Sequence, residues 1–485
     1  MKKKESLLLL TCATLFHAHP TFANAQSKPS PPNLVFIMAD QFRADAMGCM
    51  GKEPVQTPNL DKLASKGILF TNSVSSYPVS SPARAMLMTG MYPVGNKVVG
   101  NCNSQTAPYG VELSQETRCW SDVLKDHGYA TGYIGKWHLD SPYQPYVDTY
   151  NNRGKVAWNE WCPPERRHGF EQWIAYGTYD YHLKPMYWNT TAARDSFYYV
   201  DQWGPAYEAD RAIEYIRHQK ESKQPFALVV SMNPPHTGYE LVPEQYKELY
   251  KNIDVEALCK DRPDIPAKGT EMGDYFRNNI RNYYACITGV DENVGRIMEA
   301  LKQYQLSDNT IVVFTSDHGI CMGAHNSAGK DIFYEESMRI PMIISWPEKI
   351  TPRKEEQLMI GFADLYPSLL SMMGFQKKIP ETVQTFDLSK QILTGKGNKE
   401  VVQPYYFIQY DNQTTGYRGL RTNTHTYVVH ATDGKTDEVL LFDRQEDPYQ
   451  MNNIASKQPR LIRSFERQLK KWLITTNDPF ANYLP

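Results

Sequence analysis

Short, continuous runs of apolar residues recur along this chain, and each run ends at polar or turn-forming residues. Three of them are rich in β-branched and aromatic side chains: Asn33–Ala39, Phe226–Ser231 and Thr310–Thr315. Such runs are typical of strands buried on both faces, as in parallel sheets covered by helices. Segments with the helical spacing of apolar residues occur at Thr57–Ser65, Tyr207–Arg217 and Arg281–Leu301. This alternation predicts an α/β fold with a large, mostly parallel sheet flanked by helices.

Residues that can carry chemistry lie at or shortly after the end of each predicted strand. They are the pairs Asp40-Gln41, Pro235-His236 and Asp317-His318. Ligands of open α/β sheets collect beyond the carboxyl ends of the strands. A single aspartate in such a place is more often a turn or cap residue, but three strand ends with Asp or His together predict one shared site. Carboxylate and amide oxygens, with imidazole sometimes admitted, would suit a hard cation there.

The pattern changes after about residue 375. Short alternating segments predict antiparallel strands near Tyr405–Gln409, Thr426–His430 and Val439–Phe442, and Gln458–Leu473 has the spacing of a closing helix. We therefore predict a main α/β domain over residues 26–375. A smaller C-terminal α+β subdomain with an antiparallel sheet would follow over residues 376–485.

The first 25 residues have the pattern of a signal peptide. Three lysines, Lys2 to Lys4, precede an apolar stretch that is too short for a membrane span, and Ala23-Asn24-Ala25 fits a signal-peptidase site before Gln26. Cys12 leaves a lipoprotein signal as the second interpretation. We expect a secreted protein with no transmembrane segment.

Charge and cysteine content exclude some classes of function. The chain of 485 residues has a formal net charge of −2, and no basic tract follows the predicted cleavage site, which argues against a nucleic-acid partner. Seven cysteines remain after that site, dispersed through a large protein, and this is not the pattern of a disulfide framework. Cys102 and Cys119 are the closest pair that could form a single bridge.

Two further motifs have spacings that indicate chemistry. One begins at Ser80 and places Pro82 two residues later and Arg84 four residues later, before Thr89-Gly90. An unmodified serine is a poor nucleophile without a base or a metal. In the other, Lys136 and His138 are two residues apart, so that both would project to one face of an extended segment. A cation beside a histidine suits binding an anion and moving a proton, although an ordinary strand would explain this motif alone.

Taken together, these motifs resemble those of the type I sulfatases in the alkaline phosphatase superfamily. The pattern S-x-P-x-R-x-x-x-x-T-G resembles the first sulfatase signature, and Gly128–His138 resembles the second. Asp40-Gln41 and Asp317-His318 lie where the family places its metal residues, and Pro235-His236 matches a further family motif. The resemblance extends from about Pro32 to Pro448 and also includes Gly329-Lys330. It implies an alkaline-phosphatase-like sandwich and an activity on sulfate esters.

The resemblance also implies a mechanism. Ser80 would be oxidised to formylglycine (3-oxoalanine), whose hydrate offers two hydroxyls on one carbon, and calcium would be the metal. One hydroxyl would attack sulfur, and loss of the proton from the other would expel sulfate. The implied metal ligands are Asp40, Gln41, residue 80, Asp317 and His318. Arg84 would brace residue 80, and Lys136 and Lys330 would bind the sulfate. His236, with Lys330, would protonate the leaving alcohol. His138 would deprotonate the remaining hydroxyl.

Three positions depart from the commonest family pattern. Gln41 stands where many members have a second aspartate, so we rank it below the other three ligands. His318 stands where many have asparagine. The Gln/His combination resembles the branch of choline sulfatases, phosphonate monoester hydrolases and bacterial glycan sulfatases. Serine rather than cysteine at position 80 resembles sites matured by a radical formylglycine-generating enzyme, which suggests a periplasmic protein of an anaerobe.

Aromatic residues between positions 143 and 203 are about twice as frequent as the chain average of 12 %. Aromatic faces stack on sugar rings, so we predict a sulfated carbohydrate substrate contacted by Tyr181 and His182, although these aromatic residues could equally pack a long irregular segment. A quaternary ammonium would also favour aromatics, which leaves choline sulfatase open. Phosphonate monoester or phosphodiester hydrolysis is the other enzymatic alternative. A glycan-binding relic with an unmodified Ser80 is the non-enzymatic one.

Overall fold

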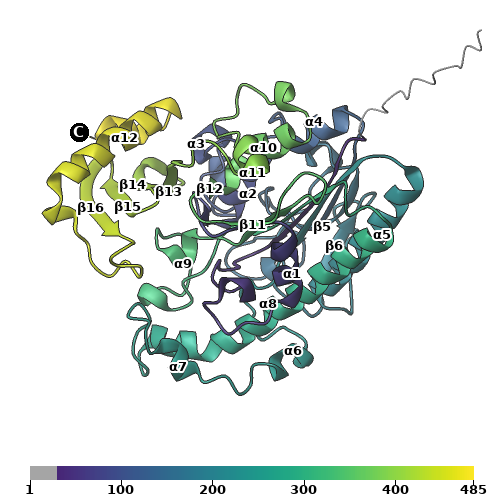
Figure 1. Ribbon diagram of the computed structural model, residues 1–485, viewed down its shortest axis with the longest axis horizontal. Helices are drawn as coiled ribbons and strands as arrows, with labels where there is room; N and C mark the ends of the chain where they lie inside the picture. The colour runs from purple at the N-terminus through teal and green to yellow at the C-terminus, as the bar shows by residue number, and fades with distance from the viewer. Residues whose placement is uncertain (1–29, 485) are drawn as a thin grey trace, which may run out of the picture. The chain divides into compact units, whose positions relative to one another are not determined.

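Ten strands form one mixed sheet in the computed structural model, which describes residues 30–484 (Figure 1). The predicted signal peptide lies outside the described residues. In spatial order the strands are β11 (Arg353–Glu355), β2 (Ile68–Phe70), β10 (Met342–Ser345), β9 (Thr310–Ser316), β1 (Asn33–Ala39), β8 (Phe226–Met232), β4 (Ala130–Lys136), β5 (Gln172–Tyr176), β6 (Met186–Asn189) and β7 (Tyr198–Tyr199).

The centre of this sheet is parallel. The five strands β9, β1, β8, β4 and β5 pair in parallel, while β10 and β6 pair antiparallel to their neighbours on either side. Ala39 at the end of β1 lies opposite Ser316 of β9 and Met232 of β8. The carboxyl ends of these strands therefore meet at one edge of the sheet, as the sequence predicted.

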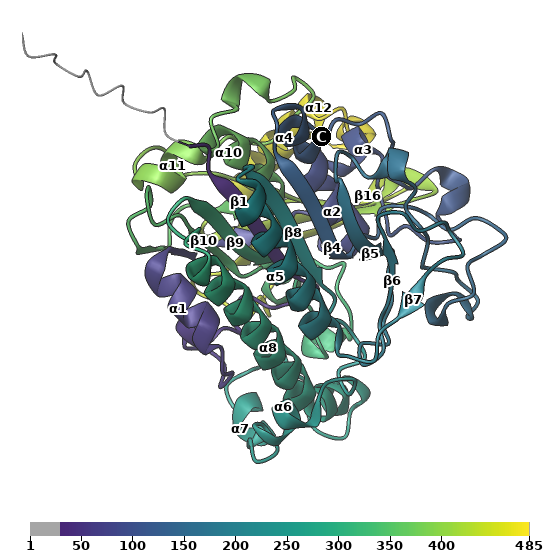
Figure 2. The same ribbon diagram turned by 90° about the vertical axis from the view of Figure 1, so that its right-hand side faces the viewer.

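Both faces of the sheet are covered by helices, and β1 shows how the sequence divides them. Leu34, Phe36 and Met38 belong to one apolar core, while Val35 and Ile37 belong to the other. Successive side chains of a strand point to opposite faces, so a continuous apolar run feeds two cores. Figure 2 looks onto the face covered by α5 and α8, the longest helices of the described chain. The helices are α1 (Pro58–Lys66), α2 (Ser80–Thr89), α3 (Pro93–Asn96), α4 (Trp120–Asp126), α5 (Gly204–Ser222), α6 (Glu244–Glu248), α7 (Val255–Cys259), α8 (Glu271–Gln303), α9 (Glu335–Met338), α10 (Leu365–Met372), α11 (Ser389–Thr394) and α12 (Pro459–Thr475).

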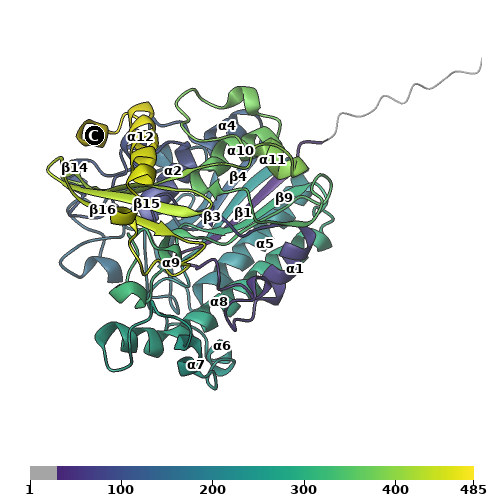
Figure 3. The same cartoon turned by 60° about the vertical axis from the view of Figure 1, so that its left-hand side comes forward.

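The C-terminal residues form the predicted antiparallel sheet, with α12 beside it (Figure 3). Its strands are β13 (Gln403–Gln409), β14 (Asn412–Arg421), β15 (His425–Thr432) and β16 (Lys435–Asp443). The side chains of Leu469 and Leu473 on α12 join the same apolar core as α2. The described residues from Pro31 onward form one compact unit. The domain boundary at residue 375 stays a prediction.

All seven cysteines in the described part of the chain are free. The candidate bridge between Cys102 and Cys119 is therefore not formed. Within residues 30–484, no helix has the length and apolar character needed to cross a bilayer.

Candidate active site

The floor of the site is built from two strand ends and the first turn of a buried helix. Asp40 follows β1, Asp317 and His318 follow β9, and Ser80 is the first residue of α2. The Ser80 hydroxyl donates a hydrogen bond to Asp40 Oδ2 at 3.2 Å and lies 3.1 Å from His318 Nε2. Ser80 is thus the point at which three segments distant in sequence converge.

Helix α2 begins and ends where its sequence allows. Pro82 lies in the first turn, where its missing N–H leaves no helical bond unmade. Gly90 ends the helix at φ 63° and donates its N–H to the Met86 carbonyl. All ten residues of the helix are buried, so the position of Ser80 is fixed by packing on every side.

Arg84 ties the two aspartates together. Its Nη2 lies 3.0 Å from Asp40 Oδ2 and 3.0 Å from Asp317 Oδ2. Its Nη1 donates to the Lys136 carbonyl and to the Ser231 hydroxyl. A planar guanidinium with this many fixed partners acts as a rigid brace between β1, β4, β8 and β9. The residue is one turn along α2 from Ser80, so the brace also fixes the helix.

The buried carboxylates differ in their electrostatic environment. Burial alone would raise the pKa of Asp40, but Lys136 and the neighbouring histidines and Arg84 outweigh it and hold that pKa well below the usual range. Burial and the charge of Asp40 both raise the pKa of Asp317. Two acidic groups this close in a site shielded from water favour a bound positive charge.

The donor set fits a metal ion. Asp40, Asp317 and His318 each offer a ligand atom, and these atoms lie within 4.8 Å of one another. The His318 ring donates from Nδ1 to the Gly319 carbonyl, so the unprotonated Nε2 faces Asp40 and Asp317 at 3.7 Å from one oxygen of each. Asp40 Oδ1 is buried without a hydrogen-bond partner, and so is Gln41 Oε1. Gln41 adopts φ 66°, a conformation uncommon outside glycine, which is a form of strain that clusters at functional sites.

Lys136 reaches the same carboxylate from the end of β4. Its Nζ lies 2.7 Å from Asp40 Oδ2 and 3.1 Å from Asn233 Oδ1. The residue before it, Gly135, has φ 101°, and a Cβ there would lie 2.1 Å from the Ser231 carbonyl oxygen. Only glycine allows β4 to approach β8 this closely at that point, and this approach sets where Lys136 leaves the strand.

The expectation that Lys136 and His138 share one face of an extended segment is wrong. Strand β4 ends at Lys136, and His138 adopts φ 54°. Both side chains still line the same cavity. The left-handed turn, rather than the alternation of a strand, is what brings them there.

His138 is set up to accept a proton. Its Nε2 lies 3.1 Å from the Cys102 carbonyl, which can only accept, so the ring proton sits on Nε2. Nδ1 is then unprotonated, and it is buried without a partner. Burial, with the charges of Lys136 and Arg84, holds the pKa of His138 well below its usual value, so the ring is neutral at pH 7.

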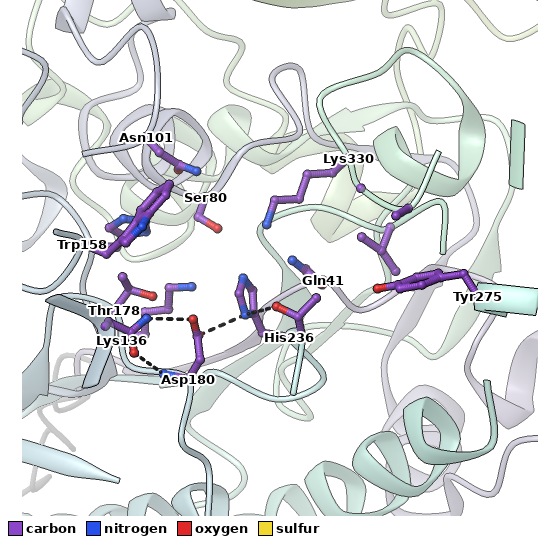
Figure 4. A pocket seen from close by; sticks show the side chains of 16 residues that line it. Gln41, Ser80, Asn101, Lys136, Trp158, Thr178, Asp180, His236, Tyr275 and Lys330 are labelled. Carbon is purple, nitrogen blue, oxygen red and sulfur yellow. Dashed lines mark hydrogen bonds and ion pairs between the residues drawn. The ribbon is translucent and has the colours of Figure 1, made fainter. Parts of the chain in front are cut away.

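A cavity of about 400 Å³ lies over this floor (Figure 4). His236, which follows β8 beyond a cis Pro234-Pro235 bond, lies in its wall, and Lys330 comes from the loop after β9. Every predicted catalytic residue except Arg84 lines this cavity, and Arg84 lies beneath it. The remaining lining residues are Gln41, Asn101, Asn151, Trp158, Thr178, Asp180, Thr237, Tyr275, Ile320, Ala328 and Gly329.

Comparison with known proteins identifies the chain. A sequence profile of the family described as Sulfatase matches residues 32–375, which is more than half of the chain. The protein is a sulfatase. A second profile, described as N-sulphoglucosamine sulphohydrolase, C-terminal, matches residues 323–478. The enzyme therefore hydrolyses sulfuric esters, as the resemblance implied.

Several of its relatives are bacterial sulfatases. An endo-4-O-sulfatase of Bacteroides thetaiotaomicron is 34 % identical, over 96 % of this chain and 97 % of that protein. An ulvan-active sulfatase of Formosa agariphila is 33 % identical, over 94 % of this chain and 84 % of its own. A crystal structure described as the sulfatase yidJ of Bacteroides fragilis is 79 % identical, covers 96 % of this chain and 100 % of its own, and superposes with a TM-score of 0.94. The sulfatase fold expected from the sequence is confirmed.

The two predicted substrate contacts lie in different places. Tyr181 is 38 % exposed and its ring lies 5.9 Å from that of Tyr150, outside the cavity lining. His182 is buried, and its Nε2 lies 3.0 Å from the Thr237 carbonyl and 3.3 Å from the His236 carbonyl. His182 thus supports the main chain of the sulfatase's His236 rather than lining the cavity.

Several polar residues of the site were not predicted from the sequence, including Asp180 and Thr237 in the cavity wall. Asn101, Asn151 and Thr178 line the cavity, and Asn233 binds Lys136 Nζ. Asn233 directly follows β8, so the rule that ligands collect beyond strand ends could have found it. Asn101, Asn151 and Thr178 lie in connecting segments whose sequence carries no comparable signal.

Proposed function

We propose that this sulfatase hydrolyses sulfate monoesters of a glycan, using formylglycine made from Ser80 and a bound calcium ion. The observation that carries the proposal is the position of Ser80 Oγ, which lies against Asp40 and His318 at the floor of a cavity with two lysines and two histidines in its walls. A serine that took up sulfate would become an alkyl sulfate with no second hydroxyl to expel it. A hydrated aldehyde at position 80 has that hydroxyl.

Four side chains that line the cavity have defined roles in this proposal. Lys136 and Lys330 bind the non-bridging sulfate oxygens and orient sulfur over residue 80. His138 accepts the proton of the remaining hydroxyl at Nδ1, the nitrogen left free by its bond to Cys102. His236 donates a proton to the oxygen of the leaving alcohol.

Asp40, Asp317 and His318 would hold the calcium ion, with Gln41 as a weaker fourth ligand. Oxygen-rich donors, two of them anionic, suit calcium among the common divalent cations. When bound, the ion supplies a Lewis acid that lowers the pKa of the attacking hydroxyl and neutralises sulfate charge. The unpartnered Asp40 Oδ1 and Gln41 Oε1 are the atoms that support this assignment.

A carbohydrate substrate is supported by the relatives and by the rim of the cavity. Two relatives are described as an endo-4-O-sulfatase and an ulvan-active sulfatase. At the rim, Asn151 and Asp180 line the cavity, and an adjacent residue on each segment, Tyr150 before Asn151 and Tyr181 after Asp180, presents an exposed ring. Paired tyrosine rings at the mouth of a polar cavity suit the face of a sugar ring.

Replacing Tyr181 with alanine is expected to raise KM for a sulfated oligosaccharide about 5- to 10-fold, the worth of one stacking contact. The kcat should change little, because Tyr181 does not reach the sulfate. Steady-state kinetics on the oligosaccharide and on the matching sulfated monosaccharide would measure this. Tyr483→Ala, at another exposed tyrosine, is the matched control. An unchanged KM for the oligosaccharide would remove Tyr181 from the substrate site.

The proposal is tested against its alternatives by turnover of matched esters. Sulfated mono- and oligosaccharides of defined position should be hydrolysed in preference to phosphonate monoesters, phosphodiesters and choline sulfate. A preference for any of the last three substrates would identify the protein as the corresponding alternative enzyme of this superfamily. A glycan-binding relic would bind the sugars without turnover.

The cellular setting is proposed from the sequence. The N-terminal signal pattern and the serine at position 80 suggest a periplasmic enzyme that is matured by a radical formylglycine-generating enzyme. Fractionation of the native host would test the location.

A further inference from the structure

Asp180 lies in the cavity wall and has no part in the roles assigned so far. It belongs to the segment between β5 and β6, and its carboxylate points toward the ring of His236 (Figure 4). The Asp180 Oδ1 atom lies 3.1 Å from His236 Nδ1. No other carboxylate oxygen of the described residues is paired with this histidine.

The Asp180 carboxylate is itself held in place from two sides. Asn151 donates from Nδ2 to Asp180 Oδ2 at 2.8 Å, and Asn233 donates from Nδ2 to Oδ1 at 3.1 Å. The Asp180 N–H in turn donates to Asn151 Oδ1 at 3.0 Å. Both carboxylate oxygens therefore already have partners within the protein, which leaves little capacity for a sugar hydroxyl.

The contact decides which nitrogen of His236 faces the substrate. An ionised carboxylate 3.1 Å away favours a proton on Nδ1, and the Thr237 hydroxyl, also 3.1 Å from that nitrogen, can accept from the same N–H. The proton that can be exchanged with a substrate is then the one on Nε2. The main chain of His236 is fixed as well, because its N–H donates to the Asn233 carbonyl. A ring fixed at both its nitrogen and its backbone meets the positional demand on a general acid.

The groups around His236 act on its proton in opposite directions. Burial and the cations Lys136 and Lys330 lower the pKa of His236, and Asp180 opposes them. Burial alone would raise the pKa of Asp180, but His236 and Lys136 hold it well below the usual range, so Asp180 stays ionised. Without the Asp180 carboxylate, the charges of Lys136 and Lys330 would favour loss of the His236 proton that the leaving group needs.

We propose that Asp180 is the positioning residue of the leaving-group acid: its carboxylate pairs with His236 Nδ1, orients the ring and balances the charge of the doubly protonated imidazole, whose transferable proton is on Nε2. As the S–O bond breaks, its electron pair stays on the leaving oxygen, which takes the proton from Nε2. The Nδ1 proton remains shared with Asp180. The inference rests on the proposed role of His236 as the acid.

Aryl sulfates test this directly, because they lack sugar hydroxyls that Asp180 could bind. 4-Nitrophenolate is a good leaving group and needs little protonation, whereas phenolate needs more. The variant Asp180→Asn should keep kcat for 4-nitrophenyl sulfate within about 3-fold and lose about 10- to 100-fold of kcat on phenyl sulfate, part of the contribution of a general acid. KM should change little for either ester. Asp201→Asn, at an exposed carboxylate paired with Lys184, is the matched control and should behave as wild type.

The second arm is a double-mutant cycle on phenyl sulfate. If Asp180 acts through His236, then Asp180→Asn should cost nothing further in a His236→Ala background. Additive losses, or an equal loss on both aryl esters, would overturn the inference. The same variants on a sulfated sugar separate the two proposals. Failure of the wild type on sugars with the leaving-group effect intact would count against the glycan assignment alone.

Discussion

Replacing Ser80 with alanine should reduce sulfate ester hydrolysis by about 10⁴-fold or more, the usual cost of losing a catalytic nucleophile. The fold should survive, because alanine fits the space of a serine whose hydroxyl has only two neighbours, Asp40 and His318. Kinetics on an aryl sulfate and thermal melting of the same preparation would measure both. Ser73→Ala removes another buried hydroxyl, one without a hydrogen-bond partner, and should leave turnover unchanged.

Mass spectrometry of the wild-type peptide that contains Ser80 completes this experiment. Protein from the native host should show a loss of two hydrogens at that residue, the difference between serine and formylglycine. Unmodified serine in an active preparation would remove the proposed nucleophile. Turnover by Ser80→Ala above about one per cent of wild type would do the same, since a nucleophile deletion costs far more.

Removing divalent cations should abolish turnover and lower the melting temperature together. Asp40 and Asp317 are both fully buried, and Arg84 and Lys136 are the cationic side chains paired with them. A ligand that binds only the folded state stabilises it by about 4 kcal/mol at 1,000 times its Kd. Chelation followed by calorimetry, then titration with calcium, would measure the effect, and calcium should restore both melting temperature and turnover.

Asp317→Asn provides the control for this experiment. The variant keeps the shape of the side chain but removes one of the two charges that favour a cation. Its melting temperature should respond to calcium much less than that of the wild type. An identical response in both proteins would place the calcium-binding site elsewhere, and a wild-type enzyme fully active after chelation would exclude a metal at this floor.

The strands of the main sheet could be predicted because their burial on both faces leaves a direct mark in the sequence. Asn33–Ala39 was predicted at both ends, and the polar residues after it fell at the common edge. Parallel pairing explains why these residues meet, since it places the carboxyl ends of the strands together whatever the loops between them contain. The position of Asp40 beside Asp317 followed from the topology alone.

Other parts of the fold leave weaker marks. Strand β14 was not predicted, because Asn412–Arg421 contains two glycines, two threonines and no regular alternation of apolar residues. Its pairing comes from its neighbours on both sides, β13 and β15. Tertiary context of this kind is absent from a local pattern.

The site shows the same division between strand ends and loops. Lys136 and His138 were correctly placed together, but on a wrong premise, since the turn at His138 depends on packing that two residues cannot reveal. Asp180 lay inside a segment that was suspected of contacting sugar. Its partner His236 is 56 positions away, and only the fold brings the two within 3.1 Å.

The burial of α2 has a consequence for how the enzyme is made. Ser80 is 1 % exposed, and the helix that carries it is held by Arg84 between several strand ends. A maturation enzyme that oxidises Ser80 would need the surrounding motif in its own active site, which the finished protein does not allow. Oxidation would therefore have to come first, on a chain that has not yet folded, and folding would then seal the new aldehyde in place. Biogenesis would follow a fixed order, and a chain that folded early would be permanently inactive.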